Sequence, residues 1–239
     1  MMDSSIYFEK VNTNSLFDDI ELNGYSFLPP INDLDCFNEV RNLAEKELSE
    51  VTYKESSAAH NLLEDKICIN QKLEPFLFEY AQKKLSYNGS TENKYKISRH
   101  VKPGKSSEAF RSHFDSHIFT IVFPILIPLT EDLDADGSLI VLPKLRNDTP
   151  SNLINIGQKA YYKRYGNKKS LSNLMKKNAH FNMKFHDFRP LIFLGRTTFH
   201  CNNPLSENAE HSRITFLSHF YDRDSSYSIG NVLRKLRNR

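Results

Sequence analysis

The sequence predicts a mainly β domain, a sandwich or jelly roll, flanked by helices. From about residue 95 onward, short runs rich in Val, Ile, Phe and Thr are separated by turn residues at intervals of about 8 to 15 positions, which is typical of these folds. Two segments with helical spacing of apolar residues come before them. We expect residues 1–239 to form a single domain, because a chain of 239 residues is long enough to bury a substantial core.

Residues 1–94 are expected to form a short strand and helices that support the β core. The strand covers 24–28 and ends at the Pro29-Pro30 pair, because proline has no N–H to donate to a neighbouring strand. One helix is predicted over about 32–49, with Asn or Asp at its first positions as the cap. A second helix is predicted over about 73–85, and we expect both to cover one face of a sheet.

Residues 95–221 contain the predicted strands of the jelly roll. The most apolar strand begins within the segment 111–117 and runs to Pro128. The other predicted strands cover 95–101, 138–143, 189–194, 197–201 and 212–221. An insertion at 151–180 interrupts the β pattern with helical or irregular structure, and residues 222–239 form a basic tail.

The segment 111–117 reads Arg-Ser-His-Phe-Asp-Ser-His and carries candidate metal ligands. Side chains alternate along a strand, so His113, Asp115 and His117 are expected to share one face. Two His and one carboxylate are a ligand set of Fe(II), and they leave the opposite coordination positions open to substrates and O₂. The third ligand must come from elsewhere, and the candidate is His200, at the end of a predicted strand.

A candidate anion-binding pair follows the distal histidine. Arg213 lies thirteen positions after His200, early in the last predicted strand, and Thr215 shares its face. A guanidinium can bind a carboxylate through two parallel hydrogen bonds, and a neighbouring hydroxyl can add another.

This pattern resembles the Fe(II)/2-oxoglutarate-dependent dioxygenase superfamily, whose fold is a double-stranded β-helix, over residues 95–221. The segment Gly137–Pro143 is similar to one found in phytanoyl-CoA-dioxygenase-like members. The segment Phe193–His200 is similar to the strand-turn-strand that delivers the distal His in many members. One departure is that Pro143 is followed by Lys-Leu-Arg instead of the usual Gly-Ser-His.

The resemblance implies a site and an activity. It implies that Fe(II) is bound by His113, Asp115 and His200, and that Arg213, helped by Thr215, binds the distal carboxylate of 2-oxoglutarate. The implied activity is hydroxylation of a C–H bond in a small anionic metabolite or biosynthetic intermediate, with O₂ consumed and succinate and CO₂ released. Because Asp is present where halogenation would require Gly or Ala, a halide has no vacant coordination position.

Two alternatives to a small-molecule hydroxylase stay open. The first is a protein or nucleic-acid hydroxylase with the same iron centre, and the second is a non-catalytic cupin-type protein that binds a small ligand. Arg99, Arg111 and His117 are candidate contacts to an anionic substrate, with ordinary salt bridging or buried structure as the alternative for each. The insertion has seven Lys or Arg and no acidic residue, which fits a solvated face or a lid that meets an anionic substrate.

Composition argues against several classes of protein. A formal charge of +3 is too small to indicate nucleic-acid binding, and no apolar stretch approaches the ~20 residues of a membrane span. The first residues have neither the basic nor the apolar region of a signal peptide. Cys36, Cys68 and Cys201 are odd in number and widely spaced, so we expect reduced thiols in a cytoplasmic protein.

Overall fold

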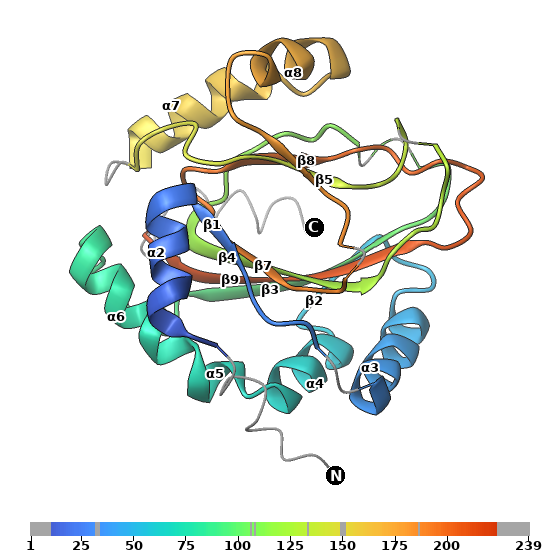
Figure 1. The fold of residues 1–239 in the computed structure, drawn as a ribbon, viewed down its shortest axis with the longest axis horizontal. Coiled ribbons are helices and arrows are strands. Elements are labelled where there is room, and N and C mark those ends of the chain that lie inside the picture. The colour runs from blue at the N-terminus through green and yellow to red at the C-terminus, as the bar shows by residue number, and fades with distance from the viewer. Residues whose placement is uncertain are drawn as a thin grey trace.

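Two β-sheets face each other, with helices on the outside of each (Figure 1). The computed structural model describes residues 11–31, 34–105, 107, 109–132, 134–148, 152–185 and 187–223. The major sheet has six strands in the order β1-β7-β4-β9-β3-β2, and the minor sheet has three in the order β6-β5-β8. Neighbouring strands pair antiparallel in both sheets. The predicted jelly-roll class is confirmed.

The strands agree with the predicted ones over most of the β core. The major sheet contains β1 (Tyr25–Phe27), β2 (Tyr53–Glu55), β3 (Lys94–Val101), β4 (His117–Leu126), β7 (Leu191–Leu194) and β9 (Arg213–Asp222). The minor sheet contains β5 (Leu139–Leu142), β6 (Phe181–Met183) and β8 (Phe199–Asn202). The short strands β2 and β6 were not predicted.

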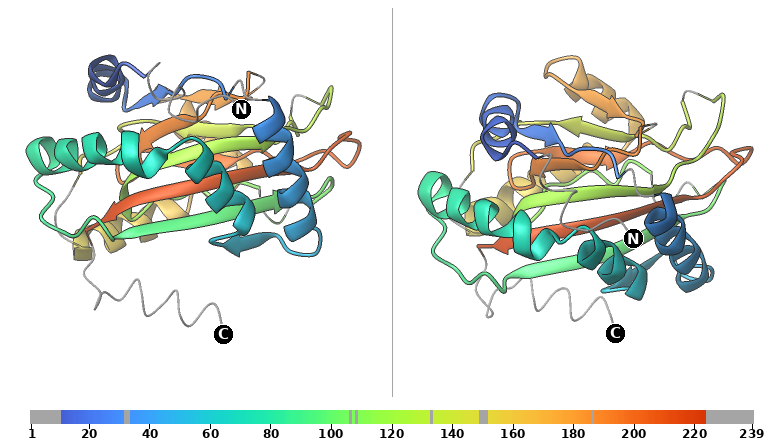
Figure 2. Two further views of the ribbon diagram at one scale, coloured as in Figure 1. Left: turned by 90° about the horizontal axis from the view of Figure 1, so that it is seen from below. Right: turned by 60° about the horizontal axis from the view of Figure 1, so that its bottom comes forward.

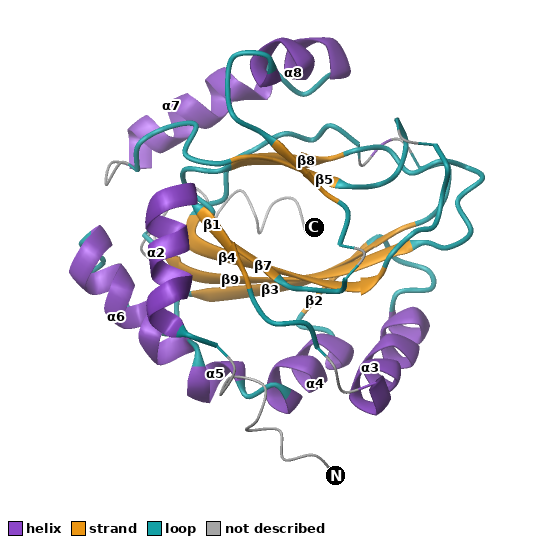
Figure 3. Ribbon diagram, viewed as in Figure 1, coloured by secondary structure: helices purple, strands orange, loops and turns teal. Residues whose placement is uncertain are grey.

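Of the helices before the core, α3 to α6 cover the outer face of the major sheet and α2 lies beside its β1 edge, as Figures 2 and 3 show. They are α2 (Thr13–Asn23), α3 (Leu34–Glu47), α4 (Ala58–Lys66), α5 (Ile69–Lys72) and α6 (Glu74–Leu85). The predicted helices over 32–49 and 73–85 correspond to α3 and α6, and the proposed cap at residues 32–33 lies outside the described residues. Among the described residues, no helix is both long and apolar enough to cross a membrane.

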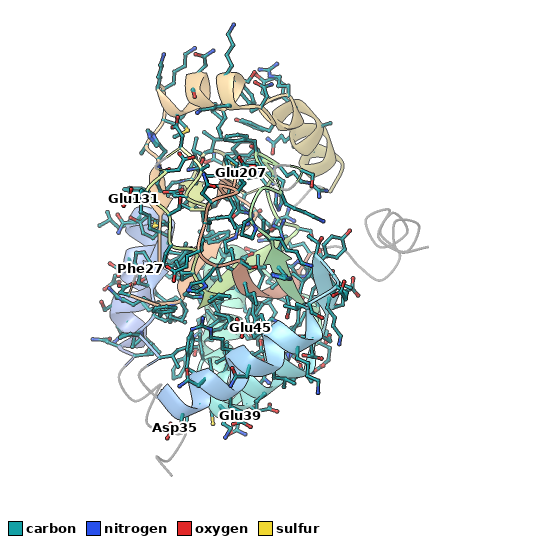
Figure 4. The ribbon with its side chains drawn as sticks, turned by 90° about the vertical axis from the view of Figure 1, so that its right-hand side faces the viewer. Phe27, Asp35, Glu39, Glu45, Glu131 and Glu207 are labelled. Atoms are coloured by element: carbon teal, nitrogen blue, oxygen red, sulfur yellow. The ribbon has the colours of Figure 1, made fainter. Side chains whose placement is uncertain are left out.

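A hydrophobic core between these helices and the major sheet holds the layers together. Each helix contributes one apolar face: in α3, Val40 and Ala44 are fully buried, whereas Asp35 and Glu39 lie on the outer side (Figure 4). Every residue of β4 is buried, because the helices cover one side of this strand and the minor sheet faces the other. Full burial of a large apolar side chain is worth about 1.5–3 kcal/mol, so these contacts stabilise the packing of the helices on the sheet.

The strand predicted to begin within the segment 111–117 begins only at its last residue. His113 forms a bridge with His200 of the minor sheet, with N–O distances of 3.0 Å in both directions. Two residues later, the amide of Asp115 donates to the carbonyl of Gly195, which follows β7 of the major sheet. The segment therefore crosses from one sheet to the other, and a backbone that changes partners this quickly is not a continuous strand.

The insertion folds into α7 (Asn152–Lys163) and α8 (Lys168–Met175) above the minor sheet (Figure 1). Leu171 and Leu174 of α8 pack in one cluster with Ile140 and Leu142 of β5. The neighbouring β5 residues Leu139 and Val141 belong to the cluster between the sheets, so α7 and α8 cover the outer face of the minor sheet. This placement corrects the lid interpretation: the helices lie behind the sheet that carries the distal histidine and do not cover its inner face.

Candidate metal centre

Three side chains that the sequence singled out lie together between the two sheets. The ligand atoms of His113, Asp115 and His200 are all within 4.8 Å of one another. Asp115 Oδ1 is 3.5 Å from Nε2 of His113 and 3.8 Å from Nε2 of His200. The two imidazoles therefore converge with one carboxylate oxygen, although they come from segments almost ninety residues apart.

Both imidazoles are oriented by backbone carbonyls. Nδ1 of His113 lies 2.7 Å from the carbonyl oxygen of Arg111, and Nδ1 of His200 lies 3.2 Å from that of Thr198. A carbonyl only accepts hydrogen bonds, so each Nδ1 carries the proton and each Nε2 presents a lone pair. This arrangement is the usual support of metal-bound histidine, so the residues fit a divalent metal such as Fe(II).

The electrostatics of the site suit a metal as well. Burial lowers the pKa of His200 to about 4, and the opposing attraction of Asp115 does not restore it. His200 is therefore neutral at pH 7, which is the form that binds metals. Burial alone would raise the pKa of Asp115, but the imidazoles of His200, His219 and His113 outweigh it and hold the pKa well below its usual range. The carboxylate is ionised.

Gly195 allows the close approach that positions Asp115. Its amide donates to the carbonyl of Ile118 at 2.8 Å, and its carbonyl accepts from Asp115 at 2.9 Å. A Cβ at this position would lie 2.9 Å from Cβ of Asp115 and 2.8 Å from Oγ1 of Thr120. Only glycine fits between the two sheet segments at this distance.

The buried Arg196 is hydrogen-bonded to the end of the metal-binding segment. Arg196 is 2% exposed, and its Nη1 donates to the carbonyl of Ser116 at 3.1 Å. Its Nε donates to Oδ1 of Asp148 at 2.7 Å, which pairs the buried charge. No sequence pattern identifies this arginine, because its partners lie 48 and 80 positions away in the chain.

Aromatic residues next to the histidines anchor the segment from behind. Phe114 follows His113, Phe199 precedes His200, and their rings lie 5.2 Å apart. The ring of Tyr162 in α7 contacts both, at 5.1 Å and 5.4 Å. The insertion helix thus supports the backbone of two candidate ligands without entering the space between the sheets.

The predicted anion-binding pair lies on the inner face of β9. Arg213, Thr215 and His219 share one face of this strand by alternation, and His219 Nδ1 is 3.7 Å from Asp115 Oδ2. Arg213 is 5% exposed and donates through Nη1 to the carbonyl of Gly137, and Thr215 is 8% exposed. One strand therefore carries both the anion-binding candidates and a side chain that contacts the metal-binding carboxylate.

The three candidate substrate contacts occupy different positions. Arg99 of β3 pairs with Thr215 and so belongs to the same inner face. His117 is buried, with its ring 5.2 Å from that of His219, which places it beside the site and outside the group of ligand atoms. The side chain of Arg111 is exposed, and its carbonyl is the part that contacts the site.

Comparisons with solved structures agree on the fold. A prolyl-4-hydroxylase of Pseudomonas putida matches with a TM-score of 0.54 and 13% identity, over 89% of this chain and 100% of its own. A prolyl hydroxylase from Trichoplax adhaerens was solved with a peptide fragment of the hypoxia inducible factor oxygen degradation domain. It matches with a TM-score of 0.55 and 11% identity, over 90% of this chain and 92% of its own. The non-heme α-ketoglutarate-dependent carbocyclase SnoK from nogalamycin biosynthesis matches with a TM-score of 0.56 and 10% identity, over 95% of this chain and 92% of its own.

The sequence matches no family model and no curated protein. The structural matches show that the chain has the double-stranded β-helix fold of the 2-oxoglutarate oxygenases.

Proposed function

We propose that this chain is an Fe(II)- and 2-oxoglutarate-dependent oxygenase that hydroxylates a small anionic molecule. The observation that carries the proposal is the convergence of His113, Asp115 and His200, with both Nδ1 atoms directed at backbone carbonyls. The fold shared with solved enzymes of this class supports it. When bound, the iron and its co-substrates would supply the oxidation of a C–H bond, with 2-oxoglutarate converted to succinate and CO₂.

The chain's own residues would bind, orient and exclude water. His113, His200 and Asp115 would hold the metal, and 2-oxoglutarate would bind at positions that these three ligands leave open. The guanidinium of Arg213, buried at the start of β9, would bind the distal carboxylate, with a hydrogen bond from Thr215. Phe193, whose ring lies 5.0 Å from that of His200, would keep water from the metal on the β7 side.

The anionic character of the substrate is inferred from Arg99. Arg99 lies on the inner face of the major sheet next to Thr215. Arg213 would bind 2-oxoglutarate, so the additional positive charge of Arg99 would suit an anionic group of the substrate. The competing candidate is a peptide hydroxylase, because prolyl hydroxylases are among the solved structures with this fold and one of them holds a peptide. Succinate release in the presence of acidic metabolites, compared with proline-containing peptides, distinguishes the two.

Anaerobic visible spectroscopy tests the cofactor assignment. We expect an absorption band that appears only when Fe(II) and 2-oxoglutarate are both added, disappears in His113→Ala and requires more 2-oxoglutarate in Arg213→Ala. His180→Ala and Arg41→Ala, at exposed or partly exposed positions away from the site, are the matched controls and should keep the band. A folded wild-type protein that gives no band would overturn the proposal in favour of a non-catalytic binding protein.

A further inference from the structure

The second oxygen of the Asp115 carboxylate has partners of its own. Oδ1 faces the two ligand histidines, whereas Oδ2 accepts a hydrogen bond from Thr120 Oγ1 at 2.5 Å. Thr120 Oγ1 is in turn 3.0 Å from Nδ1 of His219. The two oxygens of one buried carboxylate are thus distinguished by the groups around them.

Counting protons fixes the direction of this chain of hydrogen bonds. An ionised carboxylate only accepts, so the single proton of the Thr120 hydroxyl goes to Asp115. The contact between Thr120 and His219 then requires a proton on Nδ1 of the imidazole, which donates to the hydroxyl oxygen. His219 therefore donates to Thr120, and Thr120 donates to Asp115.

The surrounding structure holds both supporting residues in place. Thr120 and His219 are directly opposite each other in the β4–β9 pair, and they are 0% and 7% exposed. The ring of His219 stacks on that of Tyr95, with centroids 5.8 Å apart, and lies 5.2 Å from that of His117. Neither residue can turn away without disturbing the centre of the major sheet.

We propose that Thr120 and His219 are positioning residues that make Asp115 a one-oxygen metal ligand. By occupying Oδ2, they leave Oδ1 as the oxygen directed at the space between His113 and His200. A carboxylate that binds through one oxygen leaves one more coordination position free than one that binds through both. The inference rests on the proposed function, because the free positions are the ones that 2-oxoglutarate and O₂ would need.

Binding of Co(II), followed by its visible absorption, tests this without any turnover. Thr120→Val removes the hydroxyl and keeps the shape, and we expect Co(II) affinity to fall about 10- to 100-fold, the usual effect of losing an outer partner of a ligand, with a changed absorption spectrum. Thr120→Ser keeps the hydroxyl and should restore both. His219→Phe keeps a ring but loses the donor, whereas His219→Asn keeps a donor near the position of Nδ1 and should bind more tightly than His219→Phe.

A double variant tests whether His219 acts through Thr120. If it does, adding His219→Phe to Thr120→Val should lower Co(II) affinity no further. Wild-type affinity and spectrum in Thr120→Val would overturn the inference while the metal site itself stands. If Thr120→Val does not fold, equal affinities of His219→Phe and His219→Asn would overturn it. A wild-type protein that binds no Co(II) would overturn the proposed function and this inference together.

Discussion

Single residues at this site are constrained mainly by what surrounds the Asp115 carboxylate. His113 and His200 lie on one side of it, Thr120 on the other, and the backbone of Gly195 packs directly against its Cβ. A buried carboxylate is costly unless it is paired and hydrogen-bonded. Here Oδ2 accepts from Thr120, whereas Oδ1 faces the lone pairs of the two Nε2 atoms and would be paired by a bound metal. The absence of a side chain at position 195 is therefore as much a part of the site as the ligands are.

Gly195→Ala should damage the metal site more than the fold. The added methyl group lies within 3 Å of Asp115, Thr120 and the carbonyl of His117, so we expect a stability loss of about 1–3 kcal/mol from overpacking and a weaker metal site from a displaced carboxylate. Urea unfolding and Co(II) titration measure the two effects. Gly157→Ala is the matched control, because nothing lies within 4 Å of the added atom. Unchanged Co(II) affinity in a folded Gly195→Ala protein would contradict the explanation.

At the scale of elements, β9 connects the site to a second buried polar group on the opposite face of the major sheet. His219 points to Asp115, and its neighbour Ser218 points to α4. Ser218 Oγ donates to Glu64 Oε1 at 2.5 Å and lies 2.9 Å from Nε2 of His60, and Lys96 of β3 forms an ion pair with the same carboxylate. The carboxylate ties α4 to β3 and β9.

Glu64 should make the stability of the protein depend on pH. Burial alone raises its pKa, but His60, Lys96 and Ser218 outweigh it and hold the pKa at about 2, below the ordinary 4.5. The folded state therefore resists protonation: the stabilisation is complete above about pH 4.5 and is lost as the pH falls toward 2. Burial lowers the pKa of His60, so loss of stability with falling pH begins already below 6.5.

Urea unfolding of Glu64→Gln at several pH values measures this contribution. We expect a loss of about 3 kcal/mol at pH 7, because one partner of a buried ionic group is removed, and a flatter stability curve between pH 4.5 and 2. Glu79→Gln removes an exposed pair with Lys83 and should change stability by at most about 0.5 kcal/mol. Parallel curves for the wild type and Glu64→Gln below pH 4.5 would contradict the assignment.

Over the whole molecule, charge is divided between the insertion and the rest. The insertion carries +7 and the chain +3, so the remainder carries −4. The exposed lysines of this basic segment include Lys168, Lys169, Lys176 and Lys177. They lie with α8 on the outer face of the minor sheet, and fields from exposed charges are screened over about 10 Å at 0.1 M salt. They are poorly placed to act on an anion between the sheets.

Replacing these four lysines by glutamine should leave 2-oxoglutarate binding nearly unchanged. We expect its dissociation constant, measured through the Fe(II)-dependent absorption band, to stay within about twofold of the wild type, since the charges are exposed and screened. Arg213→Gln is the positive control, because it removes the proposed direct contact. A rise of fivefold or more in the four-lysine variant would show that the insertion reaches the site after all.

Sequence reasoning succeeded where the signal was local and failed where it depended on pairing. The apolar run of β4 and the spacing of α3 and α6 are visible in the chain itself. The loop character of the segment 111–116 was missed, because its residues pair with two different sheets and nothing in the sequence specifies those partners. The role of His219 was missed for the same reason, since its contact with Thr120 spans 99 positions and depends on the β4–β9 register.

Because the segment 111–117 crosses between the sheets, the metal site would also stabilise the contact between them. His113 is hydrogen-bonded to β8 and Asp115 to the turn after β7, so a bound metal would add a further connection between the two sheets. Folding and metal loading would then be thermodynamically linked: at one hundred times its dissociation constant, Co(II) should raise the free energy of unfolding by about 2.7 kcal/mol. Chelator-treated protein should unfold at a lower temperature than metal-loaded protein. The largest increase in amide exchange is expected in β8, which would lose its metal-mediated connection to the major sheet.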